Sequence, residues 1–371
     1  MKILHAESSL GWGGQELRSV LEIKLLAAIG HTAVIATSQK SQFSLRSGLA
    51  PQQIRFAGIE KKNFRGLFEA FRILRVFEPD ILVTHSSTDS WLFTIARWIL
   101  RSKCGLIRMR HVRADVSSNF ATRWLYSRSQ FIVTTSEDIR AHLISRLRLS
   151  PDRVVSIPTG IDVARFSVDS NRKQMVHYEK LGVPSNVRVV VMVSTLRTWK
   201  GHDAAIRAIR EISGHILVIV GDGPRESHLR RMVKDLGLSR KVIFSGFCHE
   251  VENLLAIADV FLQPSLRHEG VSQSLLQAGA MGLPVVVSDI GGLNEVVEDG
   301  VTGLVIEPGS VEGLVSAIRR FENDSRLADA CGKKLRETIH SRFNQERMIE
   351  RMEALYRLAA REGEFFDSSR N

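Results

Sequence analysis

Three loops in the sequence hold residue types that could bind an anionic substrate. In the first, residues 11–16, Gly13 and Gly14 precede a helical segment. Glycine lets a backbone approach a ligand closely, and a helix N-terminus favours an anion. The loop is neither the GxGxxG fingerprint nor a P-loop. On its own it fits a phosphate or sugar site and a tight turn equally well.

The second loop, residues 194–202, carries Arg197 and Lys200 three positions apart. An arginine fork and a lysine point charge at this spacing could clamp a diphosphate. The alternative is an ordinary solvated loop.

The third segment, residues 267–284, has Glu269 and Gln277 eight positions apart, slightly over two helical turns, so both can face one cleft. The step from Glu269 to Gly270 opens a helix. The backbone N–H groups from Gly270 to Ser272 would then be available to an anion.

Short β-branched runs alternate with helix-length segments, which predicts parallel sheets covered by helices on both faces. Ligands bind outside the carboxyl ends of such strands, where the three loops lie. The runs form two series and predict two Rossmann-like halves in an α/β protein. The predicted strands are residues 2–5, 33–36, 54–56, 81–84, 105–109 and 131–134, then 188–193, 215–220, 241–244, 260–263, 284–288 and 304–306.

These patterns divide the chain into five parts. An N-terminal Rossmann-like domain is predicted at 1–167, a polar linker at 168–185, and a C-terminal Rossmann-like domain at 186–344. A helix is predicted at 345–360, packing back toward the N-terminal domain, with a loose polar tail at 361–371.

Composition excludes several classes of protein. With 371 residues, 44% hydrophobic and 25% charged, the chain has enough material for two cores and is not mainly disordered. Its three cysteines (Cys104, Cys248 and Cys331) are far apart, which argues against a disulfide framework or a zinc site. No apolar run approaches a membrane span, and Glu7 interrupts any signal-peptide core. We therefore expect a soluble, cytoplasmic protein.

The net charge of +11 is concentrated in the first half of the chain. Residues 1–170 hold 24 Lys and Arg against 14 Asp and Glu, and the remaining residues are nearly balanced. Such an excess favours anionic partners such as phosphorylated substrates or acidic lipids, although it could also be a solubilising surface. Nucleic acid is disfavoured because no binding motif occurs. The segment 90–101 could be an interfacial amphipathic helix, but we favour a buried one.

Taken together in order and spacing, the motifs resemble the family 4 retaining glycosyltransferases over essentially the whole chain. The resemblance implies the GT-B fold, in which two Rossmann-like parallel-sheet domains face each other across a cleft. The segments that carry it are the loop at 11–16, 157–162 with Phe166, Lys200-Gly201, 220–224, 244–247, 269–284, Gly291-Gly292 with Glu295, and 299–304.

The resemblance implies that a nucleotide sugar binds the C-terminal domain. Lys200 matches the lysine that neutralises the diphosphate, and Glu269 matches the first glutamate of the family's E-x7-E motif, which contacts sugar hydroxyls. Further donor contacts are implied at Gly13, Gly14, Gly246, Phe247, Gly270, Val271 and Ser272.

Two positions depart from the family pattern. Thr195 stands where an arginine is usual, and Arg197 could substitute for it. Gln277 stands in place of the second glutamate of the motif. It can accept a hydrogen bond from the ribose but supplies no charge.

In the N-terminal half, His111 resembles the family histidine that faces the donor sugar. Arg110 and His85 are expected to contact the acceptor, and His5 is interpreted as a filled core position. His111, Glu269, Lys200 and Arg197 are the expected catalytic group.

The sequence contains no DxD triplet, so we expect neither a divalent metal nor another cofactor, with UDP-sugar as the favoured donor. Front-face attack by an acceptor hydroxyl is the mechanism that the resemblance implies. We expect a glycan or lipid-linked acceptor in bacterial cell-surface polysaccharide or lipopolysaccharide synthesis, reached from an anionic membrane surface at the inner face of the cytoplasmic membrane.

Three other interpretations stay open at this stage. A nucleotide-sugar epimerase of the same fold would need no acceptor, and the basic N-terminal half weighs against it. A non-catalytic sugar-nucleotide or glycan-binding module is kept open by Thr195 and Gln277. A Rossmann dehydrogenase would need the GxGxxG fingerprint, which is absent.

Overall fold

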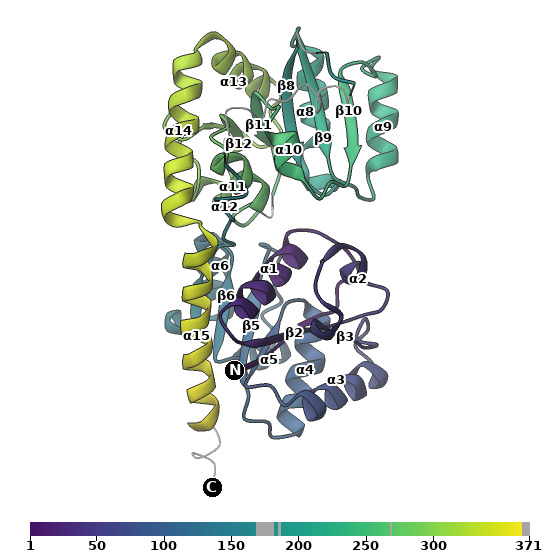
Figure 1. Ribbon diagram of the computed structural model, residues 1–371, viewed down its shortest axis with the longest axis vertical. Helices are drawn as coiled ribbons and strands as arrows, with labels where there is room; N and C mark the ends of the chain where they lie inside the picture. The colour runs from purple at the N-terminus through teal and green to yellow at the C-terminus, as the bar shows by residue number, and fades with distance from the viewer. Residues whose placement is uncertain (168–181, 185–186, 268, 366–371) are drawn as a thin grey trace. The chain divides into compact units, whose positions relative to one another are not determined.

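The computed structural model describes residues 1–167, 182–184, 187–267 and 269–365. The chain forms two compact units (Figure 1). Unit 1 comprises Met1–Thr159 and Glu346–Asn371, and unit 2 comprises Gly160–Gln345. Each unit is built on one all-parallel sheet, of seven strands in unit 1 and six in unit 2. The predicted pair of parallel-sheet α/β domains is therefore confirmed.

The sheet of unit 1 has the order β3-β2-β1-β4-β5-β6-β7. Its strands alternate with helices along the chain, as parallel pairing requires. The strands are β1 (Lys2–Glu7), β2 (Thr32–Thr37), β3 (Ile54–Phe56), β4 (Ile81–Thr84), β5 (Gly105–Arg110), β6 (Phe131–Thr134) and β7 (Val154–Ser156). The helices are α1 (Gly14–Ala28), α2 (Phe43–Arg46), α3 (Phe64–Phe77), α4 (Ser87–Ile99), α5 (Phe120–Ser127), α6 (Glu137–Leu147) and α15 (Gln345–Phe365).

Alternation along β1 separates the two faces of this sheet. Leu4 and Ala6 join a core with α3 and α4. Because side chains alternate along a strand, His5 and Glu7 point to the opposite face. There α1 supplies the fully buried Arg18 and Ser19, both of which hydrogen-bond to groups of unit 1.

The last helix, α15, belongs to unit 1 although it follows the whole of unit 2 in sequence. Its Tyr356 is fully buried, and the hydroxyl donates to Glu22 on α1. Gly105 lies so close to α15 that a Cβ there would come within 2.7 Å of the carbonyl oxygen of Ala359. The helix continues to Phe365, so the predicted tail at 361–371 begins too early.

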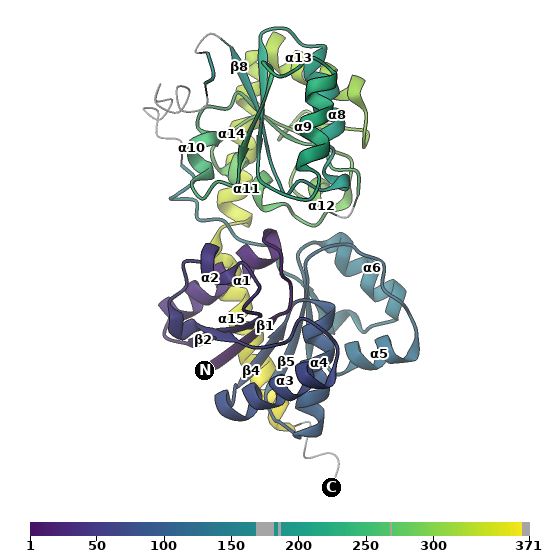
Figure 2. The ribbon, with the colours of Figure 1, turned by 90° about the vertical axis from the view of Figure 1, so that its right-hand side faces the viewer.

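The sheet of unit 2 has the order β10-β9-β8-β11-β12-β13. Figure 2 shows α8, α9 and α13 on one face of it and α10 and α11 on the other. The strands are β8 (Arg188–Val193), β9 (His215–Val220), β10 (Val242–Gly246), β11 (Val260–Gln263), β12 (Val285–Ser288) and β13 (Leu304–Ile306). The helices are α8 (His202–Arg210), α9 (Glu226–Asp235), α10 (Val251–Leu255), α11 (Gln273–Ala280), α12 (Gly291–Asn294), α13 (Val311–Asn323) and α14 (Ser325–Arg342).

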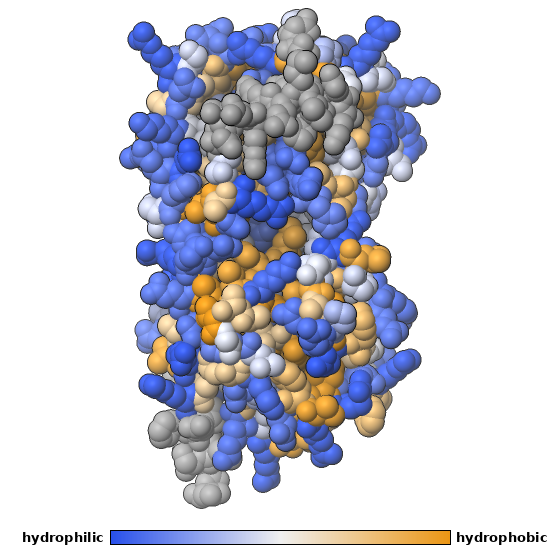
Figure 3. Space-filling model, viewed as in Figure 1, coloured by the Kyte–Doolittle hydropathy of each residue, from blue (hydrophilic) through white to orange (hydrophobic). Residues whose placement is uncertain are grey.

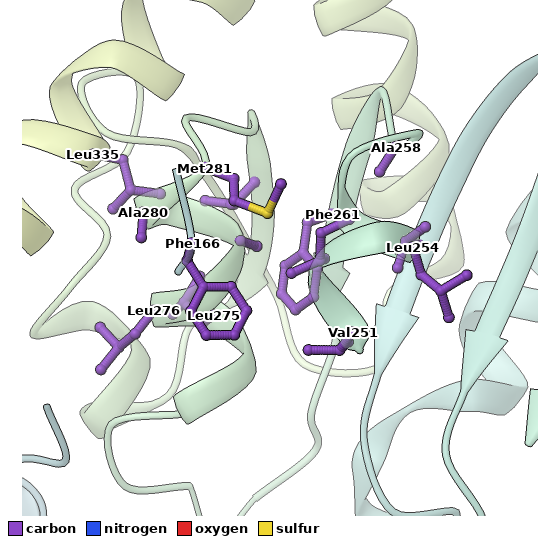
Figure 4. Packing of buried hydrophobic residues seen from close by; sticks show 14 of the residues in the cluster. Phe166, Val251, Leu254, Ala258, Phe261, Leu275, Leu276, Ala280, Met281 and Leu335 are labelled. Carbon is purple, nitrogen blue, oxygen red and sulfur yellow. The ribbon is translucent and has the colours of Figure 1, made fainter. Parts of the chain in front are cut away.

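Unit 2 begins earlier than the sequence suggests. Ile161 and Phe166 are both buried in its hydrophobic core, and Figure 4 shows Phe166 among the α11 residues of that cluster. Ile161 also pairs with Asn344 as an isolated bridge. The first domain therefore ends at Thr159 rather than at 167. Most of the predicted linker, 168–185, lies outside the described residues.

Candidate active site

A lysine–glutamate pair stands at the carboxyl ends of the central strands of unit 2. The Nζ atom of Lys200 donates to Oε1 of Glu269 at 2.6 Å, and both side chains are mostly shielded from water. Lys200 ends a short 3-10 helix after β8, and Glu269 follows β11, which pairs with β8. The structure thus brings together two residues that the sequence proposed separately.

Further hydrogen bonds tie Glu269 to the start of α11. The Ser265 hydroxyl donates to Oε1 of Glu269 at 2.8 Å and accepts from the Gln263 amide at 2.9 Å. Ser274 in the first turn of α11 donates to the same Gln263 side chain at 3.2 Å. The carboxylate is therefore held in place before any ligand arrives.

Two glycines allow the backbone to pack closely around this pair. Gly201 has φ +75°, and a Cβ there would lie 1.8 Å from the carbonyl oxygen of Pro264. A Cβ added at Gly292, on α12, would lie only 2.3 Å from the carbonyl carbon of Gly270. Both positions exclude a side chain, so the loops after β8 and β11 are packed backbone against backbone.

Most of the other predicted donor residues lie around the same edge of the sheet. Val271 and Ser272 are buried, and Ser272 is the N-cap position of α11. Gln277 is half-buried on that helix, and Thr195 is half-buried after β8. Gly246 ends β10 with φ +72°, and the Phe247 ring packs edge-on against His249.

Arg197 is arranged differently from Lys200. It is exposed, and its guanidinium lies 5.4 Å from the centre of the Trp199 ring, in a cation–π contact. The structure therefore pairs Lys200 with Glu269 but shows Arg197 against Trp199.

Unit 1 holds a chain of three histidines on adjacent strands. His5 lies within β1, and His85 and His111 directly follow the carboxyl ends of β4 and β5. Nδ1 of His5 and Nε2 of His85 are hydrogen-bonded at 3.0 Å, and Nδ1 of His85 and Nε2 of His111 also at 3.0 Å. The rings are stacked, with centroids 5.2 and 5.3 Å apart. The strands β1, β4 and β5 are neighbours in the sheet, and this order brings the rings together.

Burial keeps these imidazoles neutral. Desolvation lowers the pKa of His111 to about 3, with the charges of Arg18 and Arg110 acting in the same direction. It also lowers the pKa of His85 well below its ordinary value, and that of His5 to a lesser extent. At neutral pH each ring has one N–H and one lone pair.

His85 and Arg110 differ in how far unit 1 occupies them. His85 is buried, and both of its ring nitrogens are bonded to other histidines, which disagrees with direct contact to an acceptor. Arg110 is half-buried, and one of its nitrogens donates to the carbonyl oxygen of Ala114 at 3.1 Å. Acceptor contact by Arg110 stays a prediction.

Two buried carboxyl groups hold the glycine loop before α1. Glu7 accepts from the Gln15 amide and from the Ser86 hydroxyl, and Asp89 accepts from the amide and hydroxyl of Ser8. Burial raises the pKa of Glu7 well above its ordinary value and that of Asp89 to about 6. Neither carboxyl group belongs to the motifs that predict the site.

This network positions the two predicted loop glycines. Gly13 is the N-cap residue of α1, and its carbonyl accepts from Leu17. Gly14 begins the helix, and a Cβ there would meet nothing within 4 Å. Space therefore does not require glycine at position 14 in unit 1.

Two features are absent from the described residues. No group of three or more His, Cys, Asp or Glu side chains there could hold a metal ion. No helix in the described part of the chain has the length and apolarity to cross a membrane.

Two family models match consecutive parts of the chain. Residues 12–165 match the model of Glycosyltransferase Family 4, and residues 175–338 match that of Glycosyl transferases group 1. The chain belongs to the family 4 glycosyltransferases. It is a transferase enzyme, which confirms the resemblance seen in its motifs.

Named relatives agree with this assignment. The UDP-Gal:alpha-D-GlcNAc-diphosphoundecaprenol alpha-1,3-galactosyltransferase of Escherichia coli is 26% identical over 311 residues, covering 80% of this chain and 79% of that protein. The lipopolysaccharide core biosynthesis glycosyltransferase LpsD of Rhizobium meliloti is 24% identical and covers 93% of this chain and 95% of its own.

Solved structures show the fold of the glycosyltransferase. The crystal structure of Anabaena HepE in complex with UDP-glucose matches with a TM-score of 0.84 at 21% identity, covering 96% of this chain and 99% of that one. With two parallel-sheet units and such neighbours, the expected GT-B fold is confirmed.

Proposed function

We propose that this glycosyltransferase moves a sugar from a nucleoside-diphosphate sugar, most readily a UDP-sugar, to a hydroxyl of a lipid-linked or glycan acceptor, with retention of configuration and without a metal. The observation that carries the donor site is the buried pair of Lys200 and Glu269. A diphosphate needs a cation, and sugar hydroxyls need a fixed acceptor. This pair supplies both the cation and the acceptor at the carboxyl ends of two adjacent strands.

The chemistry asked of unit 2 is stabilisation of a leaving group. Lys200 would neutralise the charge that develops on the departing diphosphate, helped by the backbone amides at Gly270–Ser272. Glu269 would accept hydrogen bonds from sugar hydroxyls, and Gln277 from the ribose. This charge neutralisation by a side chain is why we propose metal independence.

The anomeric configuration is retained because the acceptor attacks the face of the sugar from which the leaving group departs. The bond between the anomeric carbon and the phosphate oxygen breaks, and the acceptor oxygen bonds to the same face of the sugar. The acceptor proton passes to the departing phosphate oxygen. In this scheme His111 of unit 1 contacts the donor sugar, and no protein carboxylate attacks the anomeric carbon.

A lipid-linked acceptor is supported by the surface of unit 1. That unit contains 28 Lys and Arg against 18 Asp and Glu, whereas unit 2 is nearly neutral. Of the 15 exposed large hydrophobic side chains among the described residues, 13 are in unit 1. Basic charge with exposed apolar groups suits an anionic lipid surface. We therefore propose a peripheral location at the inner face of a bacterial cytoplasmic membrane.

The helix α3 presents basic and exposed apolar side chains on one face. Phe64 and Phe68 are 91% and 66% exposed, and Arg72, Arg75 and Val76 continue the same side of the helix. In Figure 3 hydrophobic side chains lie among hydrophilic ones in the region of α3 and α4. The neighbouring α4 buries Leu92 and Phe93 but exposes Trp98 and Ile99 at its end. The helix is therefore buried over most of the segment 90–101, as favoured from the sequence, and its exposed end suits the proposed lipid contact.

The relatives make a cell-surface role reasonable. The Escherichia coli relative is named for a diphosphoundecaprenol acceptor, and the Rhizobium meliloti relative for lipopolysaccharide core biosynthesis. The same chemistry here would place the chain in bacterial cell-surface polysaccharide or lipopolysaccharide synthesis.

The first test is the choice of donor. The purified protein is titrated with UDP-, GDP- and ADP-sugars, with and without EDTA, while thermal unfolding is recorded. A ligand at 100 times its dissociation constant stabilises by about 2.7 kcal/mol. We expect stabilisation by a UDP-sugar that EDTA does not change. Stabilisation that EDTA abolishes would overturn the metal-free mechanism. No response to any of the sugars would overturn the proposed donor site and favour a non-catalytic glycan-binding module.

The stereochemistry and the need for an acceptor are tested on the product. With the responding donor and a membrane extract as acceptor, NMR of the new linkage should show the donor's anomeric configuration. Inversion would overturn the front-face mechanism. Conversion of the donor sugar without any acceptor would indicate an epimerase.

A further inference from the structure

The two hydrogen bonds that join the three histidines of unit 1 must run in the same donor-to-acceptor direction. His5, His85 and His111 are joined by two hydrogen bonds of 3.0 Å, and a neutral imidazole that donates from one nitrogen accepts at the other. The three rings can therefore adopt only two arrangements together. Either all three carry the proton on Nδ1, or all three carry it on Nε2.

Ser19 on α1 contacts the middle ring without distinguishing the two arrangements. Its hydroxyl donates to the carbonyl oxygen of Gln15 at 3.1 Å, and its oxygen lies 3.3 Å from Nδ1 and 3.5 Å from Nε2 of His85. The oxygen can therefore accept from either nitrogen, and the direction is set at the buried end of the chain.

The buried end of the chain gives the direction. Nε2 of His5 is fully buried and has no hydrogen-bond partner within the described ranges. An orphaned buried N–H is rarer in proteins than an under-satisfied acceptor, so this nitrogen is assigned the lone pair and Nδ1 of His5 the proton.

We infer that His5 and His85 are positioning residues that hold His111 as its Nδ1–H tautomer. Since Nε2 of His111 accepts from His85, its only proton is on Nδ1, and that nitrogen is a hydrogen-bond donor. His111 then meets its ligand by donating and cannot take a proton there as a base. On the ligand side this rests on the proposed function, in which the N–H would donate to an oxygen of the bound nucleotide sugar.

The chain sets a tautomer but does not carry protons away. Nδ1 of His111 already holds a proton, so a proton could only leave the chain there. Its replacement would have to enter at Nε2 of His5, where the described residues offer no hydrogen-bond partner. The role of His5 is therefore to fix the orientation of the hydrogen bonds in the two rings that follow it.

The direct test is the protonation of each ring nitrogen in the ligand-free protein. The chain contains 12 histidines, so the protein is labelled with 15N-histidine and resonances are assigned from single variants. Protonated and bare ring nitrogens give well-separated 15N shifts. We expect His111, His85 and His5 all to show Nδ1–H. A proton on Nε2 of His111, or a charged His111 at neutral pH, would overturn the inference whether or not the protein transfers sugar.

Two variants at the far end of the chain test the coupling. His5→Asn keeps an amide N–H near the place of Nδ1, whereas His5→Leu removes that donor. We expect His5→Asn to keep the native His111 tautomer and a kcat within about threefold of the native value. With His5→Leu we expect a mixture of His111 tautomers and a kcat reduced roughly five- to thirtyfold, as for the loss of one hydrogen bond.

A purely structural role for His5 gives a different pattern. It would lower the thermal stability of His5→Leu but leave the His111 spectrum and kcat native, and this result would overturn the coupling. If the native tautomer is as inferred but no donor supports transfer, the proposed function fails while the tautomer assignment stands. The two failures are therefore distinguishable.

Discussion

Nζ of Lys200 lies 2.6 Å from Oε1 of Glu269, although the two residues are 69 positions apart in sequence. Each side chain compensates the other's charge while no ligand is bound. A diphosphate must therefore compete with a carboxylate for the ammonium group. This competition favours a ligand that also offers hydroxyls to that carboxylate, as a nucleotide sugar does.

Replacing Lys200 should reduce both ligand binding and stability, and a second substitution should separate the two effects. We expect Lys200→Ala to weaken nucleotide-sugar binding roughly ten- to a hundredfold, as for loss of a charged hydrogen bond, measured by calorimetry. It should also lower the melting temperature, because Glu269 is left buried without its partner. Adding Glu269→Gln should restore the melting temperature but not the binding.

The control for this pair is an exposed one. Lys334 and Glu337 on α14 form an ion pair with side chains more than half exposed. Lys334→Ala should change neither property measurably. Equal losses for Lys200→Ala and Lys334→Ala would contradict a special role for the buried pair.

Alanine at Gly201 should be far more costly than at Gly214. Both glycines have positive φ, +75° and +70°, so alanine costs about 1 kcal/mol of backbone strain at either position. Only at Gly201 does the new Cβ overlap a neighbour, the carbonyl oxygen of Pro264 at 1.8 Å. We expect an additional loss of about 1–3 kcal/mol for Gly201→Ala, measured by urea unfolding. Equal losses at both positions would argue against close packing at this loop.

His202 should make unit 2 sensitive to acid. Burial, followed by the charge of Lys200, lowers the pKa of His202 from 6.5 to about 4. Between these values the unfolded chain binds a proton that the folded chain does not, so the free energy of unfolding falls as the pH falls. The contribution lost between pH 7 and pH 5 is about 2 kcal/mol.

The variant His202→Gln isolates this contribution. Its amide can still bond Ser194, which lies 3.0 Å from Nε2 of the native ring, but it does not titrate. Urea unfolding at pH 7 and pH 5 should show a smaller loss on acidification than in the native protein, by about 2 kcal/mol. The same loss in both proteins would exclude His202 as the source.

Binding to lipid should depend on the exposed phenylalanines of α3. We expect the double variant Phe64→Ser, Phe68→Ser to cosediment at least about tenfold less with anionic vesicles, since each ring contributes up to about 1.5–3 kcal/mol when buried. Raised salt should weaken binding of the native protein. The control is Val301→Ser, at an exposed apolar position of unit 2. Native-like binding by the double variant would show that another face of the protein contacts lipid.

Most of the fold could be predicted because buried parallel strands are nearly continuous apolar runs. The predicted strands at 54–56, 81–84, 131–134, 188–193, 215–220, 260–263 and 304–306 agree with the structure residue for residue. A run of three residues is too short for its pattern to be decisive. The strands β3 and β7 (Val154–Ser156) both follow a proline-led turn, and only β3 is predicted. The boundary at Thr159 was missed because Ile161 and Phe166 reveal their core only in three dimensions.

The candidate site could be predicted residue by residue but not as a network. The motifs around Lys200 and Glu269 identified each side chain, yet their pairing depends on β8 lying beside β11. His5 carried no signal beyond a polar residue in an apolar strand. Its partners His85 and His111 are 80 and 106 positions later, and only the strand order β1-β4-β5 connects the three.

The place of α15 in unit 1 has a consequence for how the protein is made. Its Met352, Tyr356 and Ala359 fill the core of a unit whose first 159 residues leave the ribosome much earlier. Until the final helix is synthesised, the nascent N-terminal unit exposes the apolar surface that α15 later covers, while all of unit 2 is being translated. The growing chain therefore needs protection from aggregation throughout that interval. A recombinant fragment ending near residue 167 would keep this surface exposed permanently.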